Sequence, residues 1–103
     1  MITNFKNFSG IIAVELNGEM LNFRLKYNEN ILPFEISLYL GDNKYADLSV
    51  IIPESKKLSK KEFFMNPEIE QKIIKQLKIE NFIAENGKES VAGEYKTKSY
   101  ILV

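Results

Sequence analysis

The residues of this sequence that could do chemistry are carboxylates, lysines and serines, because its 103 residues include no histidine and no cysteine. Proton shuttling near neutral pH, thiolate attack and soft-metal ligation usually depend on those two residue types. Asp42 and Asp47 flank one predicted turn, and Glu15 and Glu19 flank another, so either pair could be considered for acid–base work. Nothing around these turns supplies the apolar pocket that would raise a carboxyl pKa. We therefore expect a non-enzymatic protein with no catalytic residue, metal site or cofactor.

The net charge of the chain limits the classes of partner that it can attract. Fourteen basic and 14 acidic residues cancel, so no overall field draws the chain to nucleic acid or to an anionic membrane. The only arginine is Arg24, which leaves few of the forked donors that phosphate and base-edge recognition favour. Our alternative prediction is a nucleic-acid-binding accessory factor that uses the one local basic cluster, which consists of Lys56, Lys57, Lys60 and Lys61.

The hydropathy and cysteine content of the sequence indicate the cellular compartment of the protein. The sequence has no run approaching 18 apolar residues, and its first residues lack the apolar stretch of a signal peptide. Without cysteines it can form no disulfides, which are the strongest sign of secretion. We predict a cytoplasmic protein that does not contact membranes.

The clearest predicted element is a β-hairpin over residues 12–27, where apolar residues alternate on both sides of Asn17-Gly18. That dipeptide tolerates the positive φ angles of a type I′ turn. A two-residue loop sets Val14 opposite Leu21 and Ile12 opposite Phe23, so apolar partners share one face.

A second hairpin is predicted after Pro33, with alternating strands over residues 34–40 and 48–52. A loop of two or four residues would set Asp47 against Leu38. An odd loop would set Leu38 against Leu48 and Ile36 against Val50, again as apolar pairs. We expect the odd loop, with a glycine or asparagine in the left-handed region and a bulge.

A helix is predicted from Pro67 to Leu77. Asn66 is a suitable N-cap, proline suits the first helical position, and apolar residues recur at helical spacing from Ile69 onward. A polar connection over residues 54–61 precedes it, and we expect a short helical turn around Glu62 to Met65.

The C-terminal part contains two turn signals. Asn86-Gly87 predicts a turn after residues 82–84, with residues 90–92 returning from it, and Gly93 breaks that run. Tyr95 to Val103 is then predicted to be a last strand that is apolar on both faces, which is typical of a central position in a sheet or of a covered edge.

These elements predict a single α+β domain over residues 1–103: an antiparallel sheet of four to six strands with one main helix on one face. Strand order is left open. The predicted core consists of Val14, Leu21, Phe23, Ile36, Leu38, Leu48, Val50, Ile69, Ile73 and Leu77.

The face of the sheet opposite the helix is the predicted interaction surface. Tyrosine and arginine among polar residues offer large contact areas with polar tips. We predict protein binding there through Arg24, Tyr39, Tyr45, Asp47 and Ile51. The alternative is a plain solvent face, or one covered by the segment around Phe5 and Phe8. A homodimer through an uncovered strand is a further option.

The stretch Tyr45-Ala46-Asp47-Leu48-Ser49-Val50 resembles a group of short uncharacterised bacterial proteins carried on conjugative transposons and phages. In that group, a Tyr-Ala-x-Leu-(Ser/Thr)-Val strand is followed by a linker, a helix with an acidic start and a Gly-containing tail. The resemblance covers about residues 34–103, and its later parts are the predicted helix, Gly93 and the last four residues. The chain departs from the pattern at Ile51, where an asparagine is expected, and over residues 94–99, where more Gly and Pro are expected.

This resemblance implies no activity, catalytic residue or cofactor. It does imply an accessory protein of a mobile genetic element. By analogy, such a protein would bind a host protein, for example as an inhibitor of a restriction or CRISPR nuclease.

Overall fold

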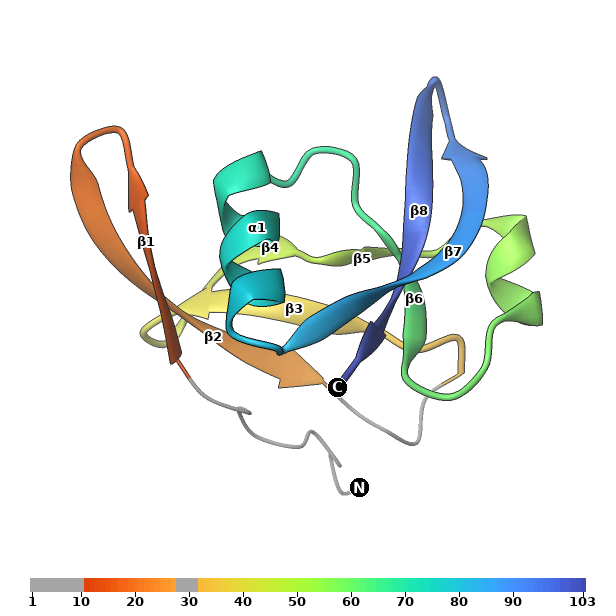
Figure 1. The fold of residues 1–103 in the computed structure, drawn as a ribbon, viewed down its shortest axis with the longest axis horizontal. Helices are drawn as coiled ribbons and strands as arrows, with labels where there is room; N and C mark the ends of the chain where they lie inside the picture. Colours follow the sequence, from red (N-terminus) through yellow and green to blue (C-terminus); the bar gives the residue numbers. More distant parts are fainter. Residues whose placement is uncertain (1–10, 28–31) are drawn as a thin grey trace.

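The structure is a computed structural model that describes residues 11–27 and 32–103. Within these residues, the fold is α+β and has two antiparallel sheets of four strands each, with one main helix (Figure 1). Sheet A has the order β1 (Ile11–Leu16), β2 (Glu19–Tyr27), β3 (Ile36–Leu40) and β4 (Asn43–Asp47). Sheet B has the order β5 (Ser49–Val50), β6 (Glu62–Met65), β8 (Tyr95–Leu102) and β7 (Ile83–Ala92). The α+β prediction is confirmed, but the strands are divided between two sheets where the sequence predicted one.

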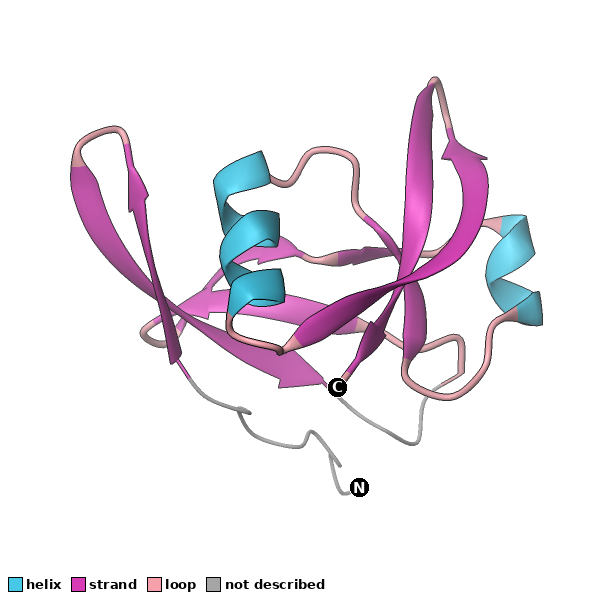
Figure 2. Cartoon of the chain, viewed as in Figure 1, coloured by secondary structure: helices cyan, strands magenta, loops and turns pink. Residues whose placement is uncertain are grey.

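Helical residues are few, as Figure 2 shows, and consist of a short 3-10 helix η1 (Pro53–Lys57) and the α-helix α1 (Gln71–Ile79). No helix in the described part of the chain is long and apolar enough to cross a bilayer.

The β1–β2 hairpin has the predicted turn and register. Asn17 and Gly18 adopt φ angles of 53° and 83°, as the two central positions of a type I′ turn require. Val14 lies opposite Leu21 and Ile12 opposite Phe23.

The predicted register between β3 and β4 is wrong. The register starts from a two-residue connection, Gly41-Asp42, between Leu40 and Asn43 and shifts by one residue beyond Tyr39, so Leu38 lies opposite Ala46, not Leu48. A bulge then leaves Tyr45 without a partner on β3. The predicted bulge and a left-handed glycine are both present, since Gly41 has a φ of 61°.

The other predicted pair, Ile36 with Val50, is also absent, because the chain leaves sheet A at Leu48. The Leu48 N–H donates to the Ile36 carbonyl at 2.9 Å, and the Leu48 carbonyl accepts the Asn66 N–H at 2.8 Å. Val50, predicted to face Ile36, pairs with Phe64 in sheet B instead.

The short helical turn predicted at Glu62 to Met65 is instead strand β6. All four of its residues are buried, so the strand shows none of the polar alternation that marks a half-exposed strand. The connection before it is polar as predicted, but it contains η1.

The main helix begins later than predicted. Asn66 Oδ1 accepts the backbone N–H of Glu68 at 3.0 Å, so Asn66-Pro67 forms a turn and α1 starts only at Gln71. The predicted apolar stripe is buried, with Ile73 and Leu77 fully inaccessible.

In the C-terminal part, Asn86-Gly87 is a bulge inside β7 and not the predicted turn. The register of β7 against β8 shifts between Glu85 and Glu89, and Gly87 takes a φ of 84°. The reversal occurs at Gly93 instead. Of the two positions predicted for the last strand, β8 has the central one, between β6 and β7.

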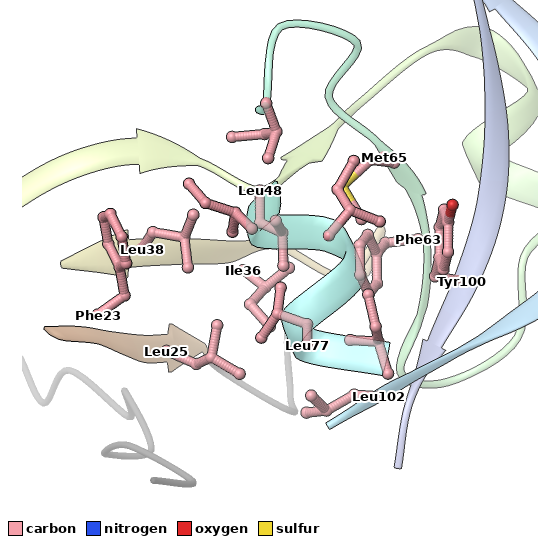
Figure 3. Close-up of a cluster of buried hydrophobic side chains, with 14 of the residues drawn as sticks. Phe23, Leu25, Ile36, Leu38, Leu48, Phe63, Met65, Leu77, Tyr100 and Leu102 are labelled. Atoms are coloured by element: carbon pink, nitrogen blue, oxygen red, sulfur yellow. The ribbon is translucent and has the colours of Figure 1, made fainter. Parts of the chain in front are cut away.

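The core lies between α1 and the two sheets (Figure 3). Leu21 and Val50, both predicted core residues, are only partly buried. Sheet B supplies buried residues that the prediction lacked, among them Phe63 and Tyr100. The buried cluster consists of Ile12, Val14, Phe23, Leu25, Phe34, Ile36, Leu38, Leu48, Phe63, Met65, Ile69, Ile73, Ile74, Leu77, Ile83, Tyr100 and Leu102.

Candidate protein-binding surface

The face of sheet A that points away from the core carries a group of polar side chains around Tyr39. On β2, Phe23 and Leu25 are buried in the core, so the residues between and beside them face outward. The register then places Arg24 and Lys44 beside Tyr39 on the neighbouring strands. We call this the outer face of sheet A; its polar residues are Asn22, Arg24, Lys26, Ser37, Tyr39, Lys44 and Asp47.

Arg24 fixes one side of this face. Its Nη2 donates to the Gly41 carbonyl at 2.8 Å and lies 4.0 Å from a carboxylate oxygen of Asp42. Because Asp42 is exposed, that longer ion pair contributes little to stability. The hydrogen bond does hold the guanidinium over the β3–β4 turn, next to Tyr39.

The ring of Tyr39 is partly buried and carries a cation on its face. The Lys26 ammonium lies 5.0 Å from the ring centroid, within the range of a cation–π contact. The aromatic ring is therefore flanked by positive groups on the strand beside it.

Asp47 supplies an acceptor at the other side of the face. The Lys44 ammonium lies 2.6 Å from Asp47 Oδ1, and the Ser37 hydroxyl donates to the same oxygen at 3.0 Å. The bond from Lys44 lowers the pKa of Asp47, although partial burial opposes the shift. The same bond raises the pKa of Lys44, so both groups are charged at neutral pH.

Two of the five residues predicted to bind a partner protein do not lie on the outer face of sheet A. The bulge turns Tyr45 to the core side of sheet A, where its ring meets the edge of Phe23 with centroids 4.8 Å apart. Its hydroxyl donates to Glu70, and this bond, with burial, raises the pKa of Tyr45. Ile51 follows β5 in sheet B and is exposed there. The structure thus brings together Arg24, Tyr39 and Asp47 only.

The predicted basic cluster stands on and after η1. Lys56 and Lys57 are exposed on η1, and Lys60 is exposed in the turn that follows. Lys61 has a φ of 65°, and its carbonyl accepts the Leu102 N–H at 2.9 Å, so the turn before β6 is bonded to β8. Nucleic-acid binding by this cluster stays a prediction.

Glu62 is a carboxylate that the sequence did not single out. Its side chain is fully buried and accepts bonds from the Ser59 N–H and hydroxyl, both at 2.9 Å, and from Lys88 Nζ at 3.1 Å. Asn86 Nδ2 donates to its other oxygen. Burial alone would raise the pKa of Glu62, but these donors together lower it to about 2. The group is therefore a permanent anion that holds the β7 bulge against β6, and it is not an acid or base near neutral pH.

The described residues contain no cluster of three or more His, Cys, Asp or Glu side chains that could hold a metal ion. Asp42 and Asp47, the carboxylates flanking the second turn, are exposed at the surface of sheet A. They line no described cavity.

A cleft beside β8 is a second feature that sequence reasoning missed. It contains Tyr100, Lys96 and Lys98, whose two-residue spacing could have indicated a shared face. This cleft was not predicted from the sequence, because the strand was expected to end at Asn86-Gly87. The continuation of β7 beside Lys96 and Lys98 was therefore not expected.

The chain matches no protein-family model, no curated protein and no solved structure in the three comparisons made. Its function therefore has to be inferred from the geometry of its surfaces.

Proposed function

We propose that this protein is a non-enzymatic binding module that contacts a partner protein through the outer face of sheet A. One observation carries the proposal: Tyr39 is a partly buried aromatic residue in the middle of a strand, with Arg24 opposite it and the Lys26 ammonium over its ring. Tyrosine and arginine are the residue types that most often dominate the energy of protein interfaces.

Prior ordering of the polar groups supports this proposal. Arg24 is held by the Gly41 carbonyl, and Asp47 is held by Ser37 and Lys44. Side chains that are already ordered lose less entropy on binding, so more of the contact energy becomes affinity. A partner that offers carboxylates to Arg24 and Lys26, and a donor to Asp47, would match the charges of this face.

We further propose that the partner is a host defence nuclease of the restriction or CRISPR type, and that the protein inhibits it as an accessory of a mobile element. The only support for this finer proposal is the resemblance over about residues 34–103. It places the protein in the cytoplasm.

The test is phage plating on bacteria that carry an active restriction or CRISPR system and express the chain. We expect expression to raise plating efficiency, and Tyr39→Ala to lower the affinity for the purified nuclease at least about tenfold. Ile79→Ala is the control, because Ile79 is an exposed apolar residue at the end of α1, outside sheet A, and this variant should bind as wild type. Circular dichroism of both variants verifies folding.

The two levels of the proposal fail separately. Unchanged plating efficiency on all such hosts would overturn inhibition of a defence nuclease. Equal affinity of the Tyr39→Ala variant and wild type would overturn the outer face of sheet A as the contact surface.

A further inference from the structure

Strand β8 has an open edge at its first two residues, Tyr95 and Lys96. β7 pairs with β8 as far as Ala92 opposite Tyr95, whereas β6 pairs with it only as far as Phe64 opposite Ser99. Beyond that pair, the chain of β6 turns away toward α1, and the β7–β8 hairpin continues alone (Figure 1). Met65, the last residue of β6, still reaches this edge, where the Thr97 hydroxyl donates to its carbonyl. Within the described residues, no strand pairs with the β6 side of β8 at Tyr95 and Lys96.

The backbone at this edge is oriented for pairing. The Leu102 N–H donates to the Lys61 carbonyl, so Leu102 directs its backbone groups to the β6 side. Backbone groups alternate between the two edges of a strand, and Lys96 therefore directs its N–H and carbonyl to the same side. At that position β6 has already left. Lys96 consequently offers a donor and an acceptor to an additional strand.

The open edge borders a cleft between the β7–β8 hairpin and the start of α1. Its volume is about 680 Å³. Met65 and Ile74 line it with buried apolar side chains, and Asn66 and Gln71 line it on the α1 side. The cleft can therefore receive side chains as well as backbone, which an ordinary strand edge cannot do.

Tyr100 places a hydroxyl in this cleft. The residue is only 7% exposed, and its ring stacks on Phe63 with centroids 6.3 Å apart. The hydroxyl points away from Leu102 (Figure 3) and has no hydrogen-bond partner among residues 11–27 and 32–103. Burial, followed by the charge of Glu85, raises the pKa of Tyr100, so the hydroxyl is a neutral donor at physiological pH. The hydroxyl itself is accessible from the cleft, since no buried side-chain oxygen or nitrogen of the described residues lacks a partner, and it can donate to an acceptor that enters the cleft.

The charged residues that line the cleft determine which kind of acceptor it favours. Lys96 and Lys98 follow Tyr100 at two-residue spacing and both line the cleft. Glu89, opposite Lys98 on β7, is the acidic residue that lines it. Lys96 lies opposite Val91, which brings no compensating charge. A carboxylate beside Lys96 is thus favoured over a cation.

We propose that an extended acidic peptide segment of a partner protein adds to sheet B at Tyr95 and Lys96 of β8, beyond the end of β6. Its backbone pairs with Lys96, a carboxylate lies beside the Lys96 ammonium, and an apolar side chain rests on Met65 and Ile74 in reach of the Tyr100 hydroxyl. Strand addition of this kind obtains affinity from main-chain bonds and specificity from pockets for alternate side chains. The proposal concerns sheet B and does not depend on the outer face of sheet A.

The test uses two labelled seven-residue peptides, one of alternating glutamate and valine and one of alternating lysine and valine. In amide NMR spectra of the full chain, we expect the glutamate peptide to shift the resonances of Tyr95 to Lys98 and to protect the Lys96 amide from exchange. The lysine peptide should leave these resonances unchanged. Shifts confined to other residues, equal shifts by both peptides or the absence of shifts would overturn the proposal.

Three variants separate charge from backbone pairing. Lys96→Glu should weaken binding of the glutamate peptide about tenfold, whereas Lys72→Glu, the same charge change on α1 outside the cleft, should not. Lys96→Pro removes the N–H at the open edge and should weaken binding further than Lys96→Ala, which removes only the charged side chain. Equal affinities of the proline and alanine variants would contradict strand addition.

Two further outcomes are decisive. If the resonances of Tyr95 to Lys98 shift with protein concentration in the absence of peptide, a second copy of the chain occupies the edge and the proposal is overturned. Tyr39→Ala should leave peptide binding unchanged, so failure of the outer face of sheet A does not affect this proposal.

Discussion

Glu62 and Lys88 form an ion pair at 3.1 Å in which the carboxylate is completely buried and the ammonium is half exposed. The pair joins β6 to the bulge of β7, which the Asn86-Gly87 dipeptide shapes. Ser59 and Asn86 complete the donors around the carboxylate. A buried anion of this kind is tolerated only while all these donors remain in place.

We expect Glu62→Gln to lower the free energy of unfolding by about 2 to 4 kcal/mol. The amide has one oxygen in place of two and carries no charge, so the donors at one of the two Glu62 positions lose their acceptor. Urea denaturation of the variant and of wild type measures the difference. Glu68→Gln is the control: Glu68 is exposed and only its backbone N–H is bonded, so its stability should stay within about 0.5 kcal/mol of wild type.

The low pKa of Glu62 predicts a loss of stability in acid. Folding lowers this pKa from 4.5 to about 2, so the unfolded chain takes up a proton before the folded one does. The resulting stabilisation, roughly 2 to 4 kcal/mol, is complete above pH 4.5 and disappears as the pH falls toward 2. Urea denaturation between pH 7 and pH 2 should show the difference between wild type and Glu62→Gln shrinking over that interval. A constant difference would mean that Glu62 has an ordinary pKa.

We expect Gly87→Ala to cost about 1 to 2 kcal/mol of unfolding free energy. Gly87 has a φ of 84°, and a methyl group there would meet no atom within 4 Å, so the cost is backbone strain alone. Gly87→Asn should cost less, because asparagine tolerates the left-handed region better than alanine. Thermal denaturation of both variants provides the comparison, and a reversed order would contradict the bulge geometry.

Tyr45 and Tyr39 should differ sharply in their effect on stability. Tyr45→Ala removes a ring that contacts buried Phe23 and a hydroxyl bonded to Glu70, and should cost about 1 to 2 kcal/mol. Tyr39→Ala removes a ring on the outer face of sheet A and should cost less than about 1 kcal/mol. Chemical denaturation measures both. Equal losses would mean that the two tyrosines lie on the same face.

The sequence predicts those parts of the fold in which local turn chemistry and side-chain alternation agree. The β1–β2 hairpin is correct because Asn17-Gly18 and the two-residue period select one register. Strand β6 was missed because its two faces are both buried, which erases the alternation by which a strand is recognised. The helix start was misplaced because the Asn66 side chain caps a turn as readily as a helix.

The outer face of sheet A was also predictable only where its strands are regular. Arg24 and Tyr39 share a face because β2 and β3 are regular, and the even spacing along each strand settles their orientation. Tyr45 was misplaced because the bulge adds one residue to β4 between Lys44 and Ala46, which breaks the two-residue alternation between Asp47 and Tyr45. Ile51 was misplaced because the chain passes into sheet B after Leu48, a tertiary event without a local signal in the sequence.

Leu48 makes the stability of sheet A depend on that of sheet B. Its N–H is bonded to β3 of one sheet, and its carbonyl is bonded to Asn66, at the end of β6 in the other. Melting either sheet would leave the other with an unsatisfied polar group at a residue that water does not reach. We therefore expect both halves to denature in one cooperative transition, with coincident midpoints whether unfolding is followed at Phe23 or at Tyr100.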